Sequence, residues 1–299
     1  MPLAPDKKKL AAEVKEFLST RRARITPEQA GLPVYGGNRR VAGLRREEVA
    51  LLAGMSVDYY IRLERGNLSG ASDAVLEALA HALQLNEAER THLYDLARAS
   101  TPSGRRPAVT ASRVRPTILR LLDSMAAVPA YVRNARFDVV AANTLGRALY
   151  APVFDSPLFA RHGPVNTARY MFLDPASQDF WVDWNKGADD AVAFLRTETG
   201  RAPHDRALTD LIGELTTRSG EFAERWARHD VRFHRSGVKK LRHPLVGSLA
   251  LPYEAMELPS DPGLRLDFYT PEPDSPARQA LDLLAGWTTT GADIPANSD

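Results

Sequence analysis

Apolar residues in the first hundred positions recur at helical spacing. One run is Leu10, Val14, Phe17 and Leu18, and a later one is Leu76, Leu79, Ala80 and Leu83. Apolar positions three and four residues apart line one face of an amphipathic helix, so residues 8–98 are predicted to form several helices. A loop rich in Gly, Pro and Arg separates the first two helices at residues 26–43. Loops of that length in compact domains tend to be functional or mobile.

The pattern changes in the second part of the chain. Strand-like segments occur at residues 131–133, 137–142, 231–233, 245–256 and 264–269, and helical patterns occur at residues 187–230 and 281–284. Strands at both ends with helices inserted between them predict an α+β domain with an antiparallel sheet. The fold class we expect is therefore a helical domain followed by an α+β domain.

Turn-forming residues without periodicity mark the join between the two patterns, at residues 100–112. A chain of 299 residues suits two domains. We expect a helical domain over residues 1–99, a linker over 100–112, an α+β domain over 113–287 and a C-terminal tail over 288–299.

Charge is unevenly distributed between the two parts. Residues 1–115 hold 19 Lys and Arg against 13 Asp and Glu, whereas the remainder holds 20 against 24. A basic part joined to an acidic one is the pattern expected of a domain that faces nucleic-acid phosphates. A solvated basic surface explains the charge alone equally well.

Composition excludes several classes of protein. The chain has no cysteine, which excludes disulfides, thiolate metal ligands and a cysteine nucleophile. Lys7, Lys8 and Lys9 could begin a signal peptide, but Glu13 and Lys15 interrupt the segment that would form its apolar region. No stretch approaches the ~18 consecutive apolar residues of a membrane helix. We expect a cytoplasmic protein with no membrane partner.

Motifs for catalysis and cofactors are also missing. The sequence contains no Walker loop, no G-x-G-x-x-G after a strand, no H-E-x-x-H and no G-x-S-x-G. His229, His234 and His243 are close in sequence, but neighbouring positions of a strand point to opposite faces, which disfavours a metal site. The sequence predicts a protein that is not an enzyme and has no cofactor or metal.

The most informative segment covers residues 44–66. A short apolar helix containing Val49 and Ala50 is followed by Gly54, at the position where a helix C-terminus favours a left-handed residue. Ser56, two residues later, is a candidate N-cap for the next helix. Two short helices joined by a tight turn make a helix-turn-helix, whose second helix enters the major groove of DNA.

This segment resembles the lambda-repressor-like (XRE-type) DNA-binding domain of five helices. The family's spacing of small, turn and capping residues occurs here as Ala50, Gly54, Ser56 and Leu63-Glu64-Arg65-Gly66. The resemblance implies that Arg46 and Ser56 meet DNA phosphates at the helix N-termini. It also places Val57, Asp58 and Arg62 at base edges, with Tyr59 nearby.

Several of these residues have more than one possible role. Arg62 suits the O6 and N7 of a guanine and Val57 suits a thymine methyl group. Asp58 either accepts a hydrogen bond from a cytosine N4 amino group or stabilises the positive end of the helix dipole. In the resembled family the position of Glu64 forms a buried pair with an arginine of the first helix, for which Arg21 and Arg22 are the candidates. Arg45 belongs with Arg39, Arg40 and Arg46 to the densest basic cluster, which either tracks the DNA backbone or is simply solvated.

The second part of the chain resembles the ligand-binding domain of MmyB-like transcription regulators over roughly residues 113–285. The resemblance rests on residues 138–143, 166–169, 172–174, 195–196 and 243–247, with Trp184, Phe222, Trp226, His229 and Val231. It implies a PAS-like fold that holds a fatty-acid-like molecule.

Five residues of this region are candidate ligand contacts, namely Asn143, Arg169, Phe172, Phe180 and Trp184. Aromatic side chains with a few polar groups line small-molecule cavities, but they also build ordinary cores. Arg169 either clamps a ligand carboxylate or forms a surface ion pair. Asn143 is alternatively interpreted as the N-cap of the helix that follows it.

Together these features predict a sequence-specific DNA-binding transcription regulator whose C-terminal domain senses a small apolar ligand such as a fatty acid. Its expected partners are a double-stranded DNA operator, the ligand and a second copy of the chain, because one recognition helix buries too little surface for tight binding. Two alternatives are a protein-interaction adaptor that retains the helix-turn-helix fold and a lipid-acting hydrolase. The basic residues disfavour the adaptor and the missing nucleophile motif disfavours the hydrolase.

Overall fold

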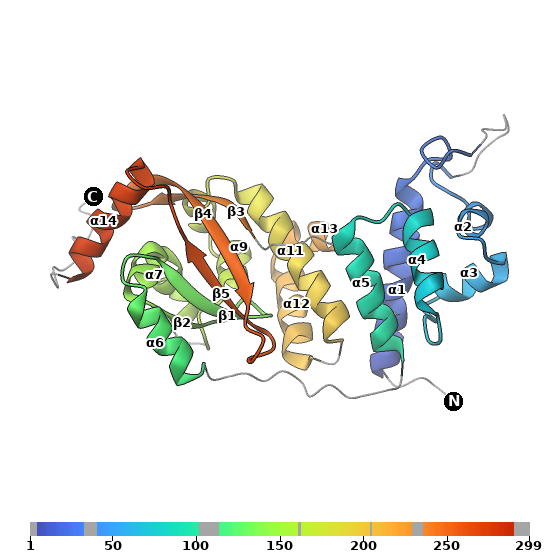
Figure 1. The fold of residues 1–299 in the computed structure, drawn as a ribbon, viewed down its shortest axis with the longest axis horizontal. Helices are drawn as coiled ribbons and strands as arrows, with labels where there is room; N and C mark the ends of the chain where they lie inside the picture. Colours follow the sequence, from blue (N-terminus) through green and yellow to red (C-terminus); the bar gives the residue numbers. More distant parts are fainter. Residues whose placement is uncertain are drawn as a thin grey trace. The chain divides into compact units, whose positions relative to one another are not determined.

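The computed structural model describes residues 5–32, 41–101, 114–160, 163–203, 205–228 and 236–289 (Figure 1). Parts of several predicted segments lie outside these residues. They are much of the loop at 26–43, nearly all of the linker at 100–112, the strand at 231–233 and most of the tail at 288–299. The domain boundary at the linker therefore stays a prediction.

Contacts within the chain define two compact units. The first comprises the described residues of Met1–Ala108, Val192–Thr209 and Glu224–Phe233, and the second comprises those of Val109–Ala191, Asp210–Ala223 and His234–Asp299. The helices α11 (Trp184–Arg201) and α12 (Arg206–Arg218) contribute residues to both units.

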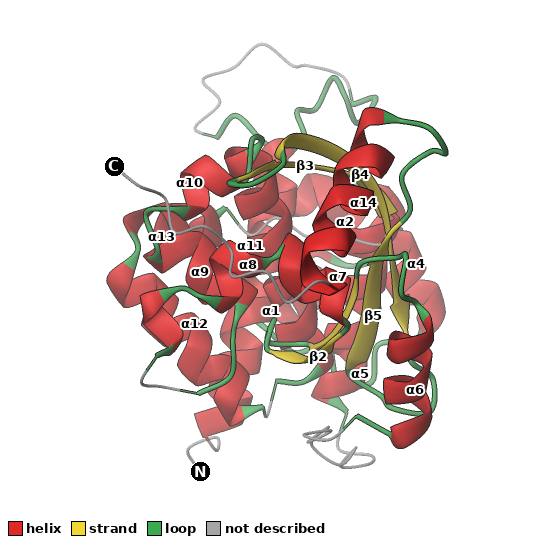
Figure 2. Ribbon diagram, turned by 90° about the vertical axis from the view of Figure 1, so that its left-hand side faces the viewer, coloured by secondary structure: helices red, strands yellow, loops and turns green. Residues whose placement is uncertain are grey.

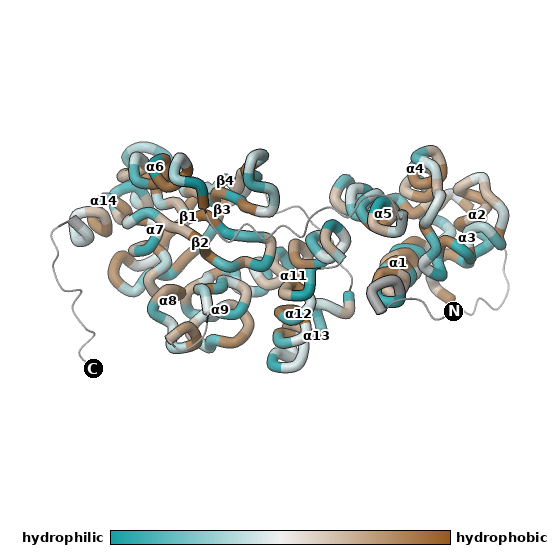
Figure 3. Tube along the Cα trace, turned by 90° about the horizontal axis from the view of Figure 1, so that it is seen from below, coloured by the Kyte–Doolittle hydropathy of each residue, from teal (hydrophilic) through white to brown (hydrophobic). Residues whose placement is uncertain are grey.

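The first unit has a helical core, as the apolar spacing predicts. Its helices are α1 (Pro5–Arg24), α2 (Arg46–Leu52), α3 (Val57–Glu64), α4 (Asp73–Ala82) and α5 (Glu87–Ser100), with the second half of α13 (Gly220–Ala227). Val14, Phe17 and Leu18 of α1 are fully buried in one cluster with apolar residues of α2 to α5. Ser72 caps α4 by accepting from the Val75 amide. Brown and teal segments alternate along such helices in Figure 3, as amphipathic helices require.

A fully buried arginine joins α11 to α1 within the first unit. Arg196 is 0% exposed, and its Nη1 lies 2.7 Å from the Glu13 carboxylate of α1. The same guanidinium lies over the Trp226 ring of α13, 3.7 Å from its centroid, and donates to the Trp226 carbonyl. Nearby, Gly200 of α11 lies directly against the buried His92 of α5. The second half of α11 therefore completes the core around α1 and α5.

The second unit is built on a five-stranded antiparallel sheet in the order β2-β1-β5-β4-β3, which confirms the expected α+β class. The strands are β1 (Ala130–Asn134), β2 (Val139–Ala142), β3 (Ser236–His243), β4 (Gly247–Glu257) and β5 (Leu264–Tyr269). Figure 2 shows β4 and β5 running side by side in this sheet. The remaining helices are α6 (Pro116–Ser124), α7 (Thr144–Leu149), α8 (Ala151–Phe154), η1 (Pro157–Phe159), α9 (Thr167–Leu173), α10 (Ser177–Phe180) and α14 (Pro276–Thr289). Of these, only α14 is longer than nine residues.

The two faces of the sheet differ in chemistry. On one face, Leu264 and Leu266 of β5 pack in an apolar cluster with Leu122 of α6. Because successive side chains of a strand alternate, Arg265 and Asp267 point to the other face, and both are buried. The buried charges of β5 thus lie on the face opposite the apolar cluster.

Both edges of the sheet are partly covered. Trp181 forms an isolated bridge with Leu241 of β3, and the Val182 amide donates to the Lys240 carbonyl at 3.1 Å. At the opposite edge, the Val139 amide donates to the Val165 carbonyl at 2.8 Å. Such cover reduces the tendency of edge strands to pair with other chains.

Candidate functional site

The turn between α2 and α3 has the geometry that the sequence predicts. Gly54 has a φ of +62°, in the left-handed region that favours glycine after a helix. Ser56 then caps α3, since its Oγ accepts from the Tyr59 amide at 3.2 Å. The expected N-cap is therefore confirmed, and the two helices are joined by a tight turn.

Helix α3 presents one buried face and one exposed face. Tyr60 and Leu63 are fully buried. Ser56, Val57, Asp58 and Arg62 are exposed, and Tyr59 is half-buried. The Arg62 guanidinium lies over the Tyr59 ring, 4.8 Å from its centroid. All the α3 residues expected to contact DNA thus lie on its accessible side.

Glu64 at the end of α3 is the centre of a buried polar cluster. Its carboxylate accepts from Arg22 Nε of α1 at 2.7 Å and from Arg46 Nε of α2. The Tyr60 hydroxyl donates to the same carboxylate at 3.4 Å. The expected structural pair is confirmed with Arg22, whereas Arg21 pairs with Glu89 at 2.9 Å.

Arg45 and Arg46 are placed differently at the start of α2. Arg45 is exposed and lies 3.7 Å from the Glu47 carboxylate. Arg46 uses its Nε for Glu64, and this hydrogen bond raises the pKa of the guanidinium, yet its side chain remains about half exposed. Arg46 is therefore oriented by Glu64 while part of it still faces solvent. Arg39 and Arg40 lie outside the described residues.

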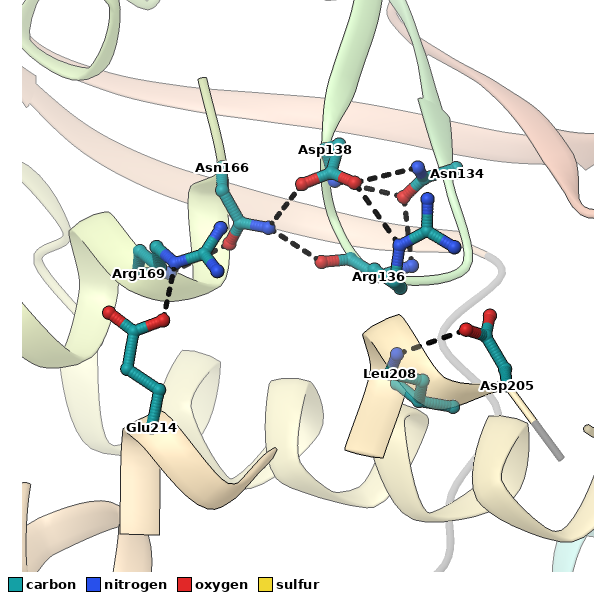
Figure 4. Close-up of polar contacts among 8 residues, drawn as sticks. All are labelled: Asn134, Arg136, Asp138, Asn166, Arg169, Asp205, Leu208 and Glu214. Atoms are coloured by element: carbon teal, nitrogen blue, oxygen red, sulfur yellow. Dashed lines mark hydrogen bonds and ion pairs between the residues drawn. The ribbon is translucent and has the colours of Figure 1, made fainter. Parts of the chain in front are cut away.

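In the second unit, two motifs of the sequence meet at Asn166, which is fully buried (Figure 4). Its side-chain oxygen caps α9 by accepting from the Arg169 amide at 2.8 Å. Its side-chain nitrogen donates to the Arg136 carbonyl at 2.7 Å and to the Asp138 carboxylate at 2.8 Å. Asp138 also accepts from the Asn134 side chain at 2.8 Å. This network fixes the β1–β2 turn to the start of α9.

A small cavity of about 30 Å³ lies on the charged face of the sheet. It is lined by Tyr131, Arg133, Phe137, Tyr150, Thr167, Ala168, Met171, Trp181, Gly187, Ala191, Lys239 and Asp267. A space of this size holds about one or two water molecules. The walls are mainly apolar, and the charged groups come from three strands.

The candidate ligand contacts with polar side chains are occupied elsewhere. Asn143 caps α7, because its side-chain oxygen accepts a hydrogen bond from the Gly146 amide at 2.7 Å. This confirms the prediction that Asn143 is a helix cap. Arg169 lies 2.8 Å from the Glu214 carboxylate of α12, and the two are drawn in Figure 4. Neither residue lines the cavity.

The aromatic candidates belong to the core beside the cavity. Phe172 packs edge-on against Trp184 and Phe222, with ring centroids 6.0 and 5.0 Å away. Phe180 is buried against Tyr150 at 5.6 Å. None of the three lines the cavity, so their role in ligand binding stays a prediction.

Comparison with known families decides what these two sites belong to. The model of the MmyB-like transcription regulator ligand binding domain matches residues 114–284, more than half of the chain. The chain belongs to the MmyB-like transcription regulators. A helix-turn-helix domain model matches residues 20–93 of the same regulator. No curated protein matches the sequence of this MmyB-like regulator.

The two matches give the MmyB-like regulator its general function. A helix-turn-helix domain and a ligand-binding domain in one chain make it a ligand-sensing, DNA-binding regulator of transcription. In the described part of the chain, no helix combines the length and hydrophobicity needed to cross a membrane. The same residues contain no group of three or more His, Asp or Glu side chains that could hold a metal ion.

Three cavity residues of the MmyB-like regulator were missed by sequence reasoning, namely Arg133, Lys239 and Asp267. Each carries a charge within a strand, and Lys239 is in phase with the buried Leu241 and His243 of β3. Side chains alternate between the two faces of a strand, so Lys239 could have been predicted to point inward. That prediction needs the start of β3, which was not recognised in the sequence.

Proposed function

We propose that this MmyB-like regulator recognises its operator with the exposed face of α3. Binding of an apolar, fatty-acid-like ligand to the second unit changes its affinity for the operator. The observation that carries the DNA-reading role is the division of α3 into a buried face and an exposed face. Ser56 and Arg62 supply polar groups on the exposed face, and Val57 supplies an apolar one. A helix with these properties suits the major groove.

The positions of Arg46 and Ser56 at two helix N-termini support phosphate contacts. Arg46 is held by Glu64 at the N-terminus of α2, and Ser56 caps the N-terminus of α3. Helix N-termini favour anions because their amides are free and the helix dipole is positive there. We assign Arg45, Arg46 and Ser56 to the DNA backbone, and Val57, Asp58, Tyr59 and Arg62 to the groove.

The test uses a duplex enriched by the full chain from a random library. Arg62→Ala should weaken binding of this duplex by about 1–3 kcal/mol and relax the preference at one base pair. Arg65→Ala is the matched control, because Arg65 is exposed at the end of α3 outside the assigned set. Equal weakening of enriched and random duplexes by Arg62→Ala would contradict base reading. Binding by the unaltered chain should also fall with rising salt.

We also infer that the regulator acts as a homodimer on a two-fold operator. A single helix-turn-helix buries too little surface for tight specific binding, whereas two copies read two half-sites about one helical turn apart. Sedimentation with and without the enriched duplex tests this. One copy per duplex at saturation would contradict it.

The ligand proposal rests on the apolar walls of the cavity together with the family of the domain. The five-stranded antiparallel sheet, with helices inserted between β2 and β3, supports a PAS-like assignment. Because a cavity of about 30 Å³ is too small for an acyl chain, we infer that binding moves α9 and α11, whose residues line it. This movement gives the ligand the unequal affinity for two conformations that regulation requires.

Titration with saturated fatty acids of increasing length tests the ligand class. Each added CH₂ that becomes buried contributes about 0.8 kcal/mol, so the affinity should rise with length until the opened cavity is full. Thermal stabilisation should follow the same order. An affinity independent of chain length would exclude an acyl-chain site.

A further inference from the structure

Two cations, Arg133 and Lys239, and one anion, Asp267, line the cavity on the charged face of the sheet. Arg133 of β1 and Asp267 of β5 are both buried, and Arg133 Nε lies 3.1 Å from the Asp267 carboxylate. The Arg133 guanidinium also lies over the Phe137 ring, 4.4 Å from its centroid. These two opposite charges compensate one another.

Lys239 of β3 is the remaining cation. It lies on the same face of the strand as Leu241 and His243, and it is partly buried. Its Nζ is 5.5 Å from the centroid of the Tyr253 ring. Among the residues that the structure describes, no carboxylate lies within ion-pair distance of this ammonium group. Burial lowers the pKa of Lys239 to about 8, with Asp267 opposing the shift.

Enclosing a cation without an opposite charge is costly, so such groups are normally paired or have a function. The residues that line the cavity therefore carry one positive charge in excess. Lys240, the next residue of β3, shows the contrast: it points to the exposed face and pairs with Asp183 at 3.1 Å.

Trp181 provides a second, independent sign of a missing polar partner. Its side chain is buried, 5% exposed, and lines the cavity. Within the described residues, its indole Nε1 has no hydrogen-bond partner. Buried indole N–H groups usually find an acceptor. The cavity thus offers a donor and an excess cation, and both are satisfied by an anionic acceptor.

We propose that the cavity is the receptor for the acidic head group of the ligand, with Lys239 as its counter-ion and Trp181 Nε1 as a hydrogen-bond donor. Two quantities select a carboxylate. The excess charge balances one negative charge, and about 30 Å³ accommodates a group the size of one or two waters. The inference rests on the proposed ligand function and moves the clamp from Arg169, which Glu214 already neutralises, to Lys239.

The experiment compares dodecanoic acid, dodecanol and methyl dodecanoate by calorimetric titration of the full chain at pH 7. The unaltered regulator should prefer the acid on the order of tenfold to a hundredfold, as charge-assisted hydrogen bonds provide. Lys239→Met should abolish this preference while Lys239→Arg retains most of it. Lys240→Met and Arg169→Ala should leave it unchanged. Circular dichroism checks that each variant is folded.

The outcomes separate this inference from the ligand proposal. Equal affinity of the unaltered chain for the three compounds, with dependence on chain length intact, overturns the head-group receptor and leaves the apolar site standing. Loss of the acid preference in Arg169→Ala, with Lys239→Met unaffected, also overturns it. Failure of all three compounds to bind overturns both proposals.

Discussion

Glu64 shows how a single residue can serve both stability and function. Its carboxylate gathers Arg22 from α1, Arg46 from α2 and the hydroxyl of Tyr60 within α3. Burial and the adjacent carboxylate raise the pKa of Tyr60, so the phenol stays neutral and can donate. The residue that fixes the three helices also orients one of the proposed phosphate contacts.

Glu64→Gln should therefore lower the stability of the first unit by about 3 kcal/mol, because it leaves the largely buried Arg22 without its counter-charge. Hydrogen exchange of α1 to α3 in the full chain measures this loss. Glu77→Gln is the control, since Glu77 and its partner Arg90 are both about half exposed. It should change the exchange little. Similar losses in the two variants would contradict the role given to Glu64.

Lys239 leads to a prediction about protons. Its pKa is held near 8 by burial, whereas a bound carboxylate would favour the charged form and raise that pKa. Acid binding between about pH 8 and pH 10 should therefore take up a proton, and binding well below pH 8 should not, because the lysine is already charged. The other groups that act on Lys239 are Asp267, Arg133, Asp190 and Lys186, and Tyr253 lies beside it.

Titrations at pH 8.5 in buffers of different ionisation enthalpy measure this uptake. The binding enthalpy should depend on the buffer for the unaltered chain and lose that dependence in Lys239→Met. Lys240→Met again serves as the control. A buffer dependence that survives Lys239→Met would assign the proton to another group.

At the scale of elements, the C-terminal end of α11 packs closely against α5. A Cβ at Gly200 would lie 2.6 Å from Cε1 of His92, whose ring is fully buried. Gly200→Ala should therefore force α11 and α5 apart and cost about 1–3 kcal/mol. In α12, a Cβ at the exposed Gly213 would meet nothing within 4 Å. Gly213→Ala should be neutral or stabilise by up to about 1 kcal/mol.

Thermal unfolding of the two variants checks this pair of predictions. The midpoint should fall for Gly200→Ala and remain or rise for Gly213→Ala. Changes of equal sign and size would mean that the approach of α11 to α5 is looser than the structure indicates.

The elements that the sequence could predict are those whose signals are local. Gly54 and Ser56 mark the α2–α3 turn within three positions, and that turn forms as expected. The helices α8 and α10 have four residues each, too few for a periodic pattern, and tertiary contacts determine them. The strand β3 was not delimited, because its exposed face carries Val238 and its buried face carries Lys239.

The proposed ligand site was harder to predict than the proposed DNA-reading face of α3, because its signals are not local. Arg169 and Glu214 are 45 residues apart, so no local pattern reveals that Arg169 has a partner. The cavity draws its charged residues from three strands that are distant in sequence. Their common location follows from the order β2-β1-β5-β4-β3, which sequence spacing does not determine.

For the whole molecule, the composition of the first unit leads to a prediction about truncation. The apolar core of residues 10–97 is contained in the N-terminal segment, so a fragment of residues 1–101 should fold. It lacks Arg196, so Glu13 loses a partner at 2.7 Å, and the face that receives α11 becomes exposed. The fragment should unfold at a lower temperature than its own helices do in the full chain. Exchange protection of α1 and α5 equal to that in the full chain would contradict this.

The late position of Arg196 in the sequence has a consequence for folding during synthesis. Helices form in about a microsecond, whereas a ribosome adds roughly 5–20 residues per second. The segment from Val192 to Arg228 follows the end of α5 by about 90 to 130 residues, so it emerges roughly 5–25 s later. During that interval α1 and α5 are present without the helix that covers Glu13 and His92. The turn between α2 and α3 can thus form on the nascent chain well before the unit that contains it is complete.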